Sequence, residues 1–141
     1  MFALAGKELA MPEYVELGAA VTESCYRMYA EQALGLGPEA AEVPTLVPQE
    51  AHWIMRPEVV ESIFVLYRVT GDPKYRQWAL NIAKSVDRYA RLETGLSGIR
   101  DVTAQVPEHN DKQESFFLAE TVKYLYLIFC DRKYVSLEEY V

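Results

Sequence analysis

The sequence predicts an all-α fold built from helical hairpins. Apolar residues recur every three or four positions along most of the chain, which is the spacing of helices with one buried face. Alternating apolar and polar runs, which would predict strands, are almost absent. Glycine and proline separate the periodic stretches, so the helices are expected to join as hairpins within the single domain that 141 residues allow.

The first predicted helix spans residues 12–33. Pro12 suits the first helical position, where a missing N–H is not needed. The face expected to be buried carries Leu17, Val21, Cys25 and Met28. The run from Gly35 to Pro38 ends this helix, and residues 35–55, which contain three prolines, are expected to form a loop.

Two further helices are predicted over residues 57–69 and 73–92. Gly71 suits the left-handed C-cap of the first of them, and Asp72 suits the N-cap of the second. Pro73 then takes the first helical position of that second helix. These residues predict a tight break between two neighbouring helices.

The remainder of the chain contains a long irregular loop, residues 94–112, and a fourth helix over residues 115–130. Ser136 to Glu139 has the spacing of a capping box, so a fifth helix is predicted to begin at Ser136. The sequence ESIF is followed by DPKY, and later in the chain the similar sequence ESFF is followed by DRKY. This echo indicates successive units of one helical-hairpin repeat.

The composition excludes several kinds of function. A net charge of -7 without a Lys/Arg cluster argues against a nucleic-acid partner. No apolar run reaches the length of a membrane-spanning helix, and no signal peptide is visible. Cys25 and Cys130 lie far apart, as do the two histidines, so no zinc site is predicted, and by composition each cysteine is expected to be a small buried residue.

A charged cluster opens the second predicted helix, with Arg56, Glu58 and Glu61 in a stretch that otherwise looks buried. Glu58 and Glu61 are three residues apart and share one helix face. One interpretation is a solvated helix end, because the helix macrodipole favours carboxylates in the first turn. The other is a pair of carboxylates that faces a pocket and is oriented by Arg56.

The fourth predicted helix raises a similar question. Glu120 lies among apolar residues, and burying it unpaired would be costly, so it either points to water or serves a site. Phe116 lies four residues earlier and shares its face. Most aromatic residues recur at helical spacing, so core packing is their default role. The more specific alternative is that some of them stack on a sugar.

Long stretches of the chain resemble glycoside hydrolase family 47, the class I α-1,2-mannosidases. These stretches are ESCYRMYAEQALGLGPE at 23–39, MRPEVVESIFVLYRVTGDPKYRQWALNI at 55–82, TGLSGIRDVT at 94–103, DKQESFFLAETVKYLYLIFCD at 111–131 and SLEEYV at 136–141. They are long, specific and in the order that the family has them. The resemblance covers nearly the whole chain, and residues 40–52 are the least similar.

The resemblance implies a partial (α/α)7 toroid of helical hairpins, with the sugar in its central cavity and Ca²⁺ at the cavity floor. The family inverts the anomeric centre, which needs a general acid on the leaving oxygen and a base that activates water. It trims high-mannose N-glycans in the secretory pathway (endoplasmic reticulum or Golgi, or secreted). By this resemblance, residues 1–141 are expected to be the C-terminal portion of a catalytic domain that extends beyond both ends, with any membrane anchor outside them.

The resemblance also implies residue roles. Glu58 matches the catalytic glutamate proposed as the base or water-activating residue. Arg56 and Phe116 match substrate-binding residues, an arginine that holds the site together and an aromatic ring under the sugar. The acids that bind calcium through its waters are matched by Glu39, Glu61 and Glu120.

Some functional residues of the family fall outside the matched region. The general acid, and an aspartate that competes with Glu58 for the role of base, lie upstream, and a threonine that ligates calcium follows the position of Val141. Cys25 matches a disulfide cysteine whose partner would precede residue 1, so Cys25 and Cys130 are not expected to pair. Residues 1–141 alone are therefore expected to be inactive.

Two other classes of function stay open. One is a mannosidase-like lectin that delivers misfolded glycoproteins to degradation, a binding function on the same fold. The other is a structural helical-hairpin module with no ligand. A general acid upstream would distinguish the enzyme from the lectin, and calcium binding would exclude the structural module.

Overall fold

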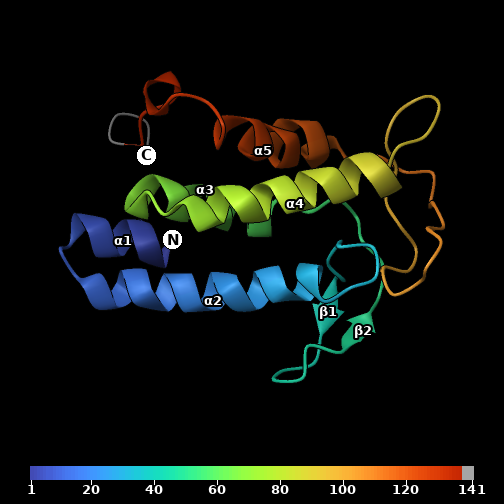
Figure 1. Cartoon of the computed structure of the whole chain (residues 1–141), viewed down its shortest axis with the longest axis horizontal. Helices are drawn as coiled ribbons and strands as arrows, with labels where there is room; N and C mark the ends of the chain where they lie inside the picture. The colour runs from blue at the N-terminus through green and yellow to red at the C-terminus, as the bar shows by residue number, and fades with distance from the viewer. Residues whose placement is uncertain (138–141) are drawn as a thin grey trace.

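The chain folds into layers of helices, with α3 at the centre (Figure 1). The computed structural model describes residues 1–137. In chain order the elements are α1 (Phe2–Glu8), α2 (Pro12–Ala30), β1 (Ala40–Ala41), β2 (Pro48–Glu50), α3 (Glu58–Thr70), α4 (Pro73–Tyr89), a π-helical segment (Phe117–Val122), α5 (Lys123–Leu127) and a 3-10 turn (Arg132–Tyr134). Helix α3 contacts α1, α2, α4 and α5, and in Figure 1 α3 and α4 lie together between α1 and α2 on one side and α5 on the other. The predicted all-α fold is confirmed.

Helix α1 was not predicted from the sequence, because it is only seven residues long and Met1 provides no side-chain cap. It packs along α2 at close range. A Cβ atom on Gly18 would come within 3.1 Å of the backbone nitrogen of Ala3, and one on Gly6 would come within 2.9 Å of the Met11 carbonyl oxygen. Glycine at both positions therefore allows the two helices to approach this closely.

The face of α2 that is buried differs from the predicted one. The buried residues are Gly18, Thr22 and Tyr29, whereas Leu17 is 45% exposed and Val21 is 47% exposed. The prediction followed the large apolar side chains, but α1 packs on the glycine-containing face because that face admits its backbone. The helix also ends at Ala30 rather than at Ala33.

The hairpin of α3 and α4 forms as its capping residues, Gly71 and Asp72, predict. Gly71 adopts a left-handed φ of 75° as the C-cap, and its N–H donates to the Tyr67 carbonyl at 2.9 Å. The Asp72 side chain caps α4 by accepting from the Lys74 N–H at 2.9 Å. Helix α4 ends at Tyr89, three residues before the predicted end.

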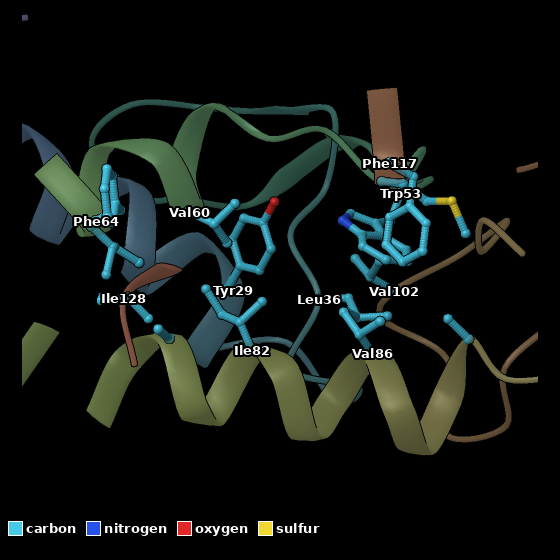
Figure 2. Close-up of a cluster of buried hydrophobic side chains, with 14 of the residues drawn as sticks. Tyr29, Leu36, Trp53, Val60, Phe64, Ile82, Val86, Val102, Phe117 and Ile128 are labelled. Atoms are coloured by element: carbon cyan, nitrogen blue, oxygen red, sulfur yellow. The ribbon is translucent and has the colours of Figure 1, made fainter. Parts of the chain in front are cut away.

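The hydrophobic core lies between α3, α4 and the segments that flank them (Figure 2). Val60 and Phe64 of α3 lie on one side of it, and Ile82 of α4 lies on the other. Tyr29 and Trp53, from outside this hairpin, fill the space between them. The core therefore fixes the start of α3 against α2 and against the segment around Trp53.

Both predicted loops carry ordered backbone pairing. Residues 35–55 contain the antiparallel pair β1–β2, and residues 94–112 contribute Ile99, which pairs with Trp53 through two hydrogen bonds of 2.8 and 2.9 Å. The Val102 N–H adds a bond of 2.8 Å to the Ala51 carbonyl. These bonds hold the segment that leads into α3.

The fourth predicted helix is confirmed, with a difference in its first turns. Residues Phe117–Val122 form a π-helical segment before α5, and α5 ends at Leu127 rather than at residue 130. The fifth helix predicted from Ser136 to Glu139 falls mainly outside the described residues. Among the described helices, none is long and apolar enough to cross a membrane.

Cys25 and Cys130 are both free cysteines in the described residues 1–137. Each is half-buried rather than fully buried. Burial raises the pKa of the Cys25 thiol above its ordinary value. A thiol with a raised pKa is a weak nucleophile at neutral pH, so neither the sequence nor the structure gives Cys25 a catalytic role.

Candidate active site

An ion pair lies just before the N-terminal end of α3. The Arg56 Nε donates to the Glu39 Oε2 at 2.5 Å, and the side chain of Arg56 is 51% exposed whereas that of Glu39 is 10% exposed. The bond to Glu39 raises the pKa of the Arg56 guanidinium, and the carboxylates of Glu58 and Glu114 lie close enough to raise it further. Arg56 therefore carries a permanent positive charge that is bonded to Glu39 and lies near the charges of Glu58 and Glu114.

The buried phenol of Tyr29 lies near Glu39 of this ion pair. The pKa of Tyr29 is raised, and burial is the largest cause. The indole N–H of Trp53 lowers this pKa, whereas the negative charges of Glu39 and Glu58 raise it further. The Trp53 Nε1 is itself buried and faces the phenol without reaching a hydrogen-bond partner in the described part of the chain. Tyr29 therefore stays neutral at neutral pH.

A second group of acids forms where α3 faces α5. The Tyr124 hydroxyl donates to the Glu61 Oε1 at 2.9 Å. Burial, this bond and then the charges of Glu61 and Glu120 raise the pKa of Tyr124 to about 12. Glu61, which is bonded to the phenol, and Glu120, which is distant from it in sequence, therefore both lie near Tyr124.

Five of the six predicted site residues thus fall into two neighbouring groups. Glu39, Arg56 and Glu58 form the first, and Glu61 and Glu120 form the second. Glu58 and Glu61 join the groups because both lie in the first turn of α3. That all their carboxylates line one cavity stays a prediction.

Phe116, the sixth predicted residue, directly precedes the π-helical segment. Its side chain is half-buried and packs against the core cluster. One turn later, the Thr121 hydroxyl donates to the Met55 carbonyl at 2.6 Å, which ties this segment to the residue before Arg56. The stretch around Phe116 and the stretch around Arg56 are therefore in direct contact.

The oxygen-rich donor set suits a hard cation such as calcium, although not as a set of direct ligands. In residues 1–137, no group of three or more acidic, histidine or cysteine side chains is arranged to hold a metal ion. Glu39 and Glu61 already bind Arg56 and Tyr124 through one oxygen each. Each keeps a second carboxylate oxygen that can accept a bond from a metal-bound water.

Three residues that shape the site were not predicted from the sequence. Tyr124 lies four positions after Glu120, and this spacing on one helix face was the available signal. Tyr29 and Thr121 had no such signal, because their partners lie far away in the sequence. Their roles depend on how α2 and the π-helical segment pack against α3.

The family model of glycosyl hydrolase family 47 matches residues 1–141. The chain belongs to glycosyl hydrolase family 47. A human mannosyl-oligosaccharide 1,2-alpha-mannosidase IC is 44% identical over 141 residues, which cover 96% of this chain and 22% of that protein. A human endoplasmic reticulum mannosyl-oligosaccharide 1,2-alpha-mannosidase is 43% identical and shares 91% of this chain with 20% of its own length. This family 47 chain therefore spans about a fifth of these relatives.

The fold comparison agrees with the family. An alpha-1,2-mannosidase from Trichoderma reesei superimposes with a TM-score of 0.83 at 31% identity, over 92% of this chain and 31% of that chain. The prediction of a partial (α/α)7 toroid is confirmed by this match. The family 47 chain thus forms an arc of helical hairpins from a glycoside hydrolase fold.

Tyr124 of this family 47 chain provides a first test of the geometry. We expect its phenol to stay protonated at pH 10 to 11, because its pKa is raised to about 12. Glu61→Gln removes the charge and should lower that pKa toward its ordinary value of about 10. The folded state binds this proton more tightly than the unfolded state, so the stabilisation is present below pH 10 and is lost as pH rises through 12.

The measurement is a ¹³C NMR titration of the Tyr124 ring. Glu13→Gln is the matched control, because Glu13 is also a first-turn carboxylate, in α2. It should leave the pKa of Tyr124 unchanged. An unchanged pKa in Glu61→Gln would contradict the hydrogen bond between Glu61 and Tyr124.

Met55 provides a second test, because its φ of 71° is left-handed and its side chain is fully buried. Met55→Gly and Met55→Ala remove the same buried contacts, but only glycine adopts this backbone conformation without strain. We expect the alanine variant to be less stable than the glycine variant by about 1 kcal/mol in denaturant unfolding. At Ile63, inside α3, the order should reverse because glycine is the poorer helix former. The same order at both positions would contradict the strain at Met55.

Proposed function

We propose that residues 1–141 form the C-terminal portion of the catalytic domain of a calcium-dependent, inverting α-1,2-mannosidase that trims high-mannose N-glycans. The observation that carries this proposal is the pair of neighbouring acidic groups at the start of α3, organised by Arg56 and Tyr124. Two human relatives are named for 1,2-alpha-mannosidase activity on mannosyl-oligosaccharides, which supports the choice of substrate.

Glu58 is the proposed base. Inversion requires one carboxylate to take a proton from water on the face of the sugar opposite to the leaving group. Glu58 is exposed to solvent and lies in the first turn of α3, where the helix macrodipole favours a negative charge. Arg56, held by Glu39, lies close enough to Glu58 for the charge of that carboxylate to raise the pKa of the guanidinium, so a positive charge lies near the proposed base.

Arg56 and Phe116 are the proposed sugar contacts. The guanidinium has five N–H donors and uses its Nε on Glu39, so other donors remain for sugar hydroxyls. The Phe116 ring is half-buried, and packing against the core would hold it still beneath a sugar ring. Both residues lie on the stretches that the hydrogen bond between Thr121 and Met55 ties together.

Glu39, Glu61 and Glu120 are the proposed acids around calcium, each through bound waters. When bound, calcium would supply polarisation of the nucleophilic water and oxygen coordination of the sugar. The chain's own contribution is orientation, because Arg56 fixes one oxygen of Glu39 and Tyr124 fixes one oxygen of Glu61. Replacing any of these three acids by glutamine would keep its size and remove its charge.

We place the protein in the secretory pathway, in the endoplasmic reticulum or the Golgi, or secreted. The proposed substrate and the name of one relative support this location. N-glycans are the proposed substrate, and one human relative carries the endoplasmic reticulum in its name. A pairing of Cys25 with a cysteine outside residues 1–141 would fit an oxidising compartment.

A chimera tests this proposal. In the human relative that is 44% identical, the segment that matches this chain is replaced by residues 1–141, and the product is called the chimera below. We expect the chimera to release mannose from α-1,2-linked mannobiose and to stop when calcium is chelated. A folded chimera that releases no mannose, or that continues to release mannose after calcium is chelated, would contradict the proposed function.

A further inference from the structure

Met55 and Thr121 form a buried hydrogen bond between the two stretches that carry the proposed site. Met55 is fully buried and Thr121 is 1% exposed. The Thr121 Oγ1 donates to the Met55 carbonyl at 2.6 Å. In residues 1–137 this hydroxyl is the only donor that reaches the Met55 carbonyl. A buried carbonyl that loses its one donor is costly, so this bond has a strong effect on local structure.

The backbone at Met55 needs this support. Its φ of 71° lies in the left-handed region, which is unfavourable for a residue with a side chain. Arg56 follows directly, so the orientation of the Met55 peptide group sets the direction in which Arg56 leaves the segment. A bond to the Met55 carbonyl therefore acts on Arg56 through the main chain.

The π-helical segment places Thr121 for this contact. Thr121 lies inside Phe117–Val122 and points into the core, whereas its neighbour Glu120 is only half-buried. Adjacent residues of a helix point in different directions, so anchoring Thr121 also fixes the direction of Glu120. Single π-helical turns of this kind are frequent at functional sites.

We propose that Thr121 is a positioning residue, whose hydroxyl holds Met55 in its left-handed conformation and thereby sets Arg56 and Glu120 relative to each other. This inference rests on the proposed function for the meaning of that arrangement. It requires the hydroxyl rather than the bulk of the side chain. Thr121→Val, which keeps the shape and removes the donor, should therefore disturb Arg56, and Thr121→Ser should not.

The readout is the Arg56 Nε–H group, observed by ¹⁵N NMR in residues 1–141. Its bond to Glu39 protects it from exchange with water. In Thr121→Val we expect this exchange to become about tenfold faster, the effect of weakening one hydrogen bond. In Thr121→Ser the exchange should stay close to that of the unchanged chain.

Thr22→Val is the matched control. Thr22 is 5% exposed and its hydroxyl donates at 2.8 Å to the Gly18 carbonyl within α2, so this variant also removes a buried threonine donor. It should lower stability and leave the Arg56 exchange unchanged. Equal exchange in Thr121→Val and Thr22→Val, or failure of Thr121→Ser to rescue, would overturn the proposal.

The same variants in the chimera separate this inference from the proposed function. Thr121→Val should lower kcat by about 10- to 100-fold with a smaller change in KM, because misplacement of a site by about 1 Å can cost about 100-fold. Unchanged kcat in an active chimera would overturn the positioning role. A chimera without any activity would contradict the proposed function, and the Arg56 exchange would then decide the role of Thr121 by itself.

Discussion

Glu58→Gln in the chimera is expected to lower kcat for mannose release by about 10²- to 10⁴-fold, the usual contribution of a general base. Glutamine keeps the size of the side chain but cannot accept the proton of the attacking water. KM should change little, because the amide can still form hydrogen bonds with a bound ligand. The measurement is steady-state release of mannose from α-1,2-linked mannobiose in the presence of calcium.

The control for this variant is Glu13→Gln. Glu13 is a first-turn glutamate of α2, just as Glu58 is a first-turn glutamate of α3. Both substitutions remove a carboxylate from the positive end of a helix, so their effects on stability should be similar. A fall in kcat confined to Glu58→Gln supports its role as the base, and equal rates in the two variants would exclude that role.

Residues 1–141 alone are expected to release no measurable mannose from the same disaccharide, even with millimolar calcium. The leaving oxygen must be protonated, and the resemblance places the general acid upstream of the matched residues. General acid catalysis contributes about 10²- to 10⁴-fold, and the resemblance also places the direct calcium ligand outside these residues. The loss of both should bring the rate below detection. Turnover by residues 1–141 that depends on calcium and disappears in Glu58→Gln would show that no group outside them is needed.

The assay of residues 1–141 needs a check that the protein is folded and monomeric. Leu17 and Val21 are exposed on α2, and a groove of about 480 Å³ between α4 and α5 is lined mainly by apolar side chains, among them Val122 and Phe129. Exposed apolar surface of this kind promotes association. Size-exclusion chromatography and circular dichroism before the assay separate inactivity from aggregation.

The hairpin of α3 and α4 could be predicted in detail because its signals are local. Gly71 and Asp72 determine where one helix ends and the next begins through contacts with residues a few positions away. The buried face of α2 could not be predicted in the same way. Its choice depends on α1, a helix that the sequence did not reveal, and on Gly18, which packs by being small.

In the candidate site, too, local features could be predicted and long-range contacts could not. The charges around Arg56 and Glu58 stood out because they interrupt an apolar pattern, and the family resemblance extended the set to Glu39 and Phe116. The contacts that organise these residues are long-range, as between Thr121 and Met55. Helical periodicity describes one element at a time, so it does not predict bonds between elements.

The most direct test of the proposed site is a crystal structure of the Glu58→Gln chimera with calcium and α-1,2-linked mannobiose. We expect the disaccharide at the N-terminal end of α3, with Arg56 bonded to a sugar hydroxyl and a sugar ring over Phe116. We also expect calcium whose waters reach Glu61 and Glu120. An ordered disaccharide bound elsewhere on the molecule, with these residues in contact only with solvent, would contradict the claim that these two stretches of the chain form one mannose-binding site.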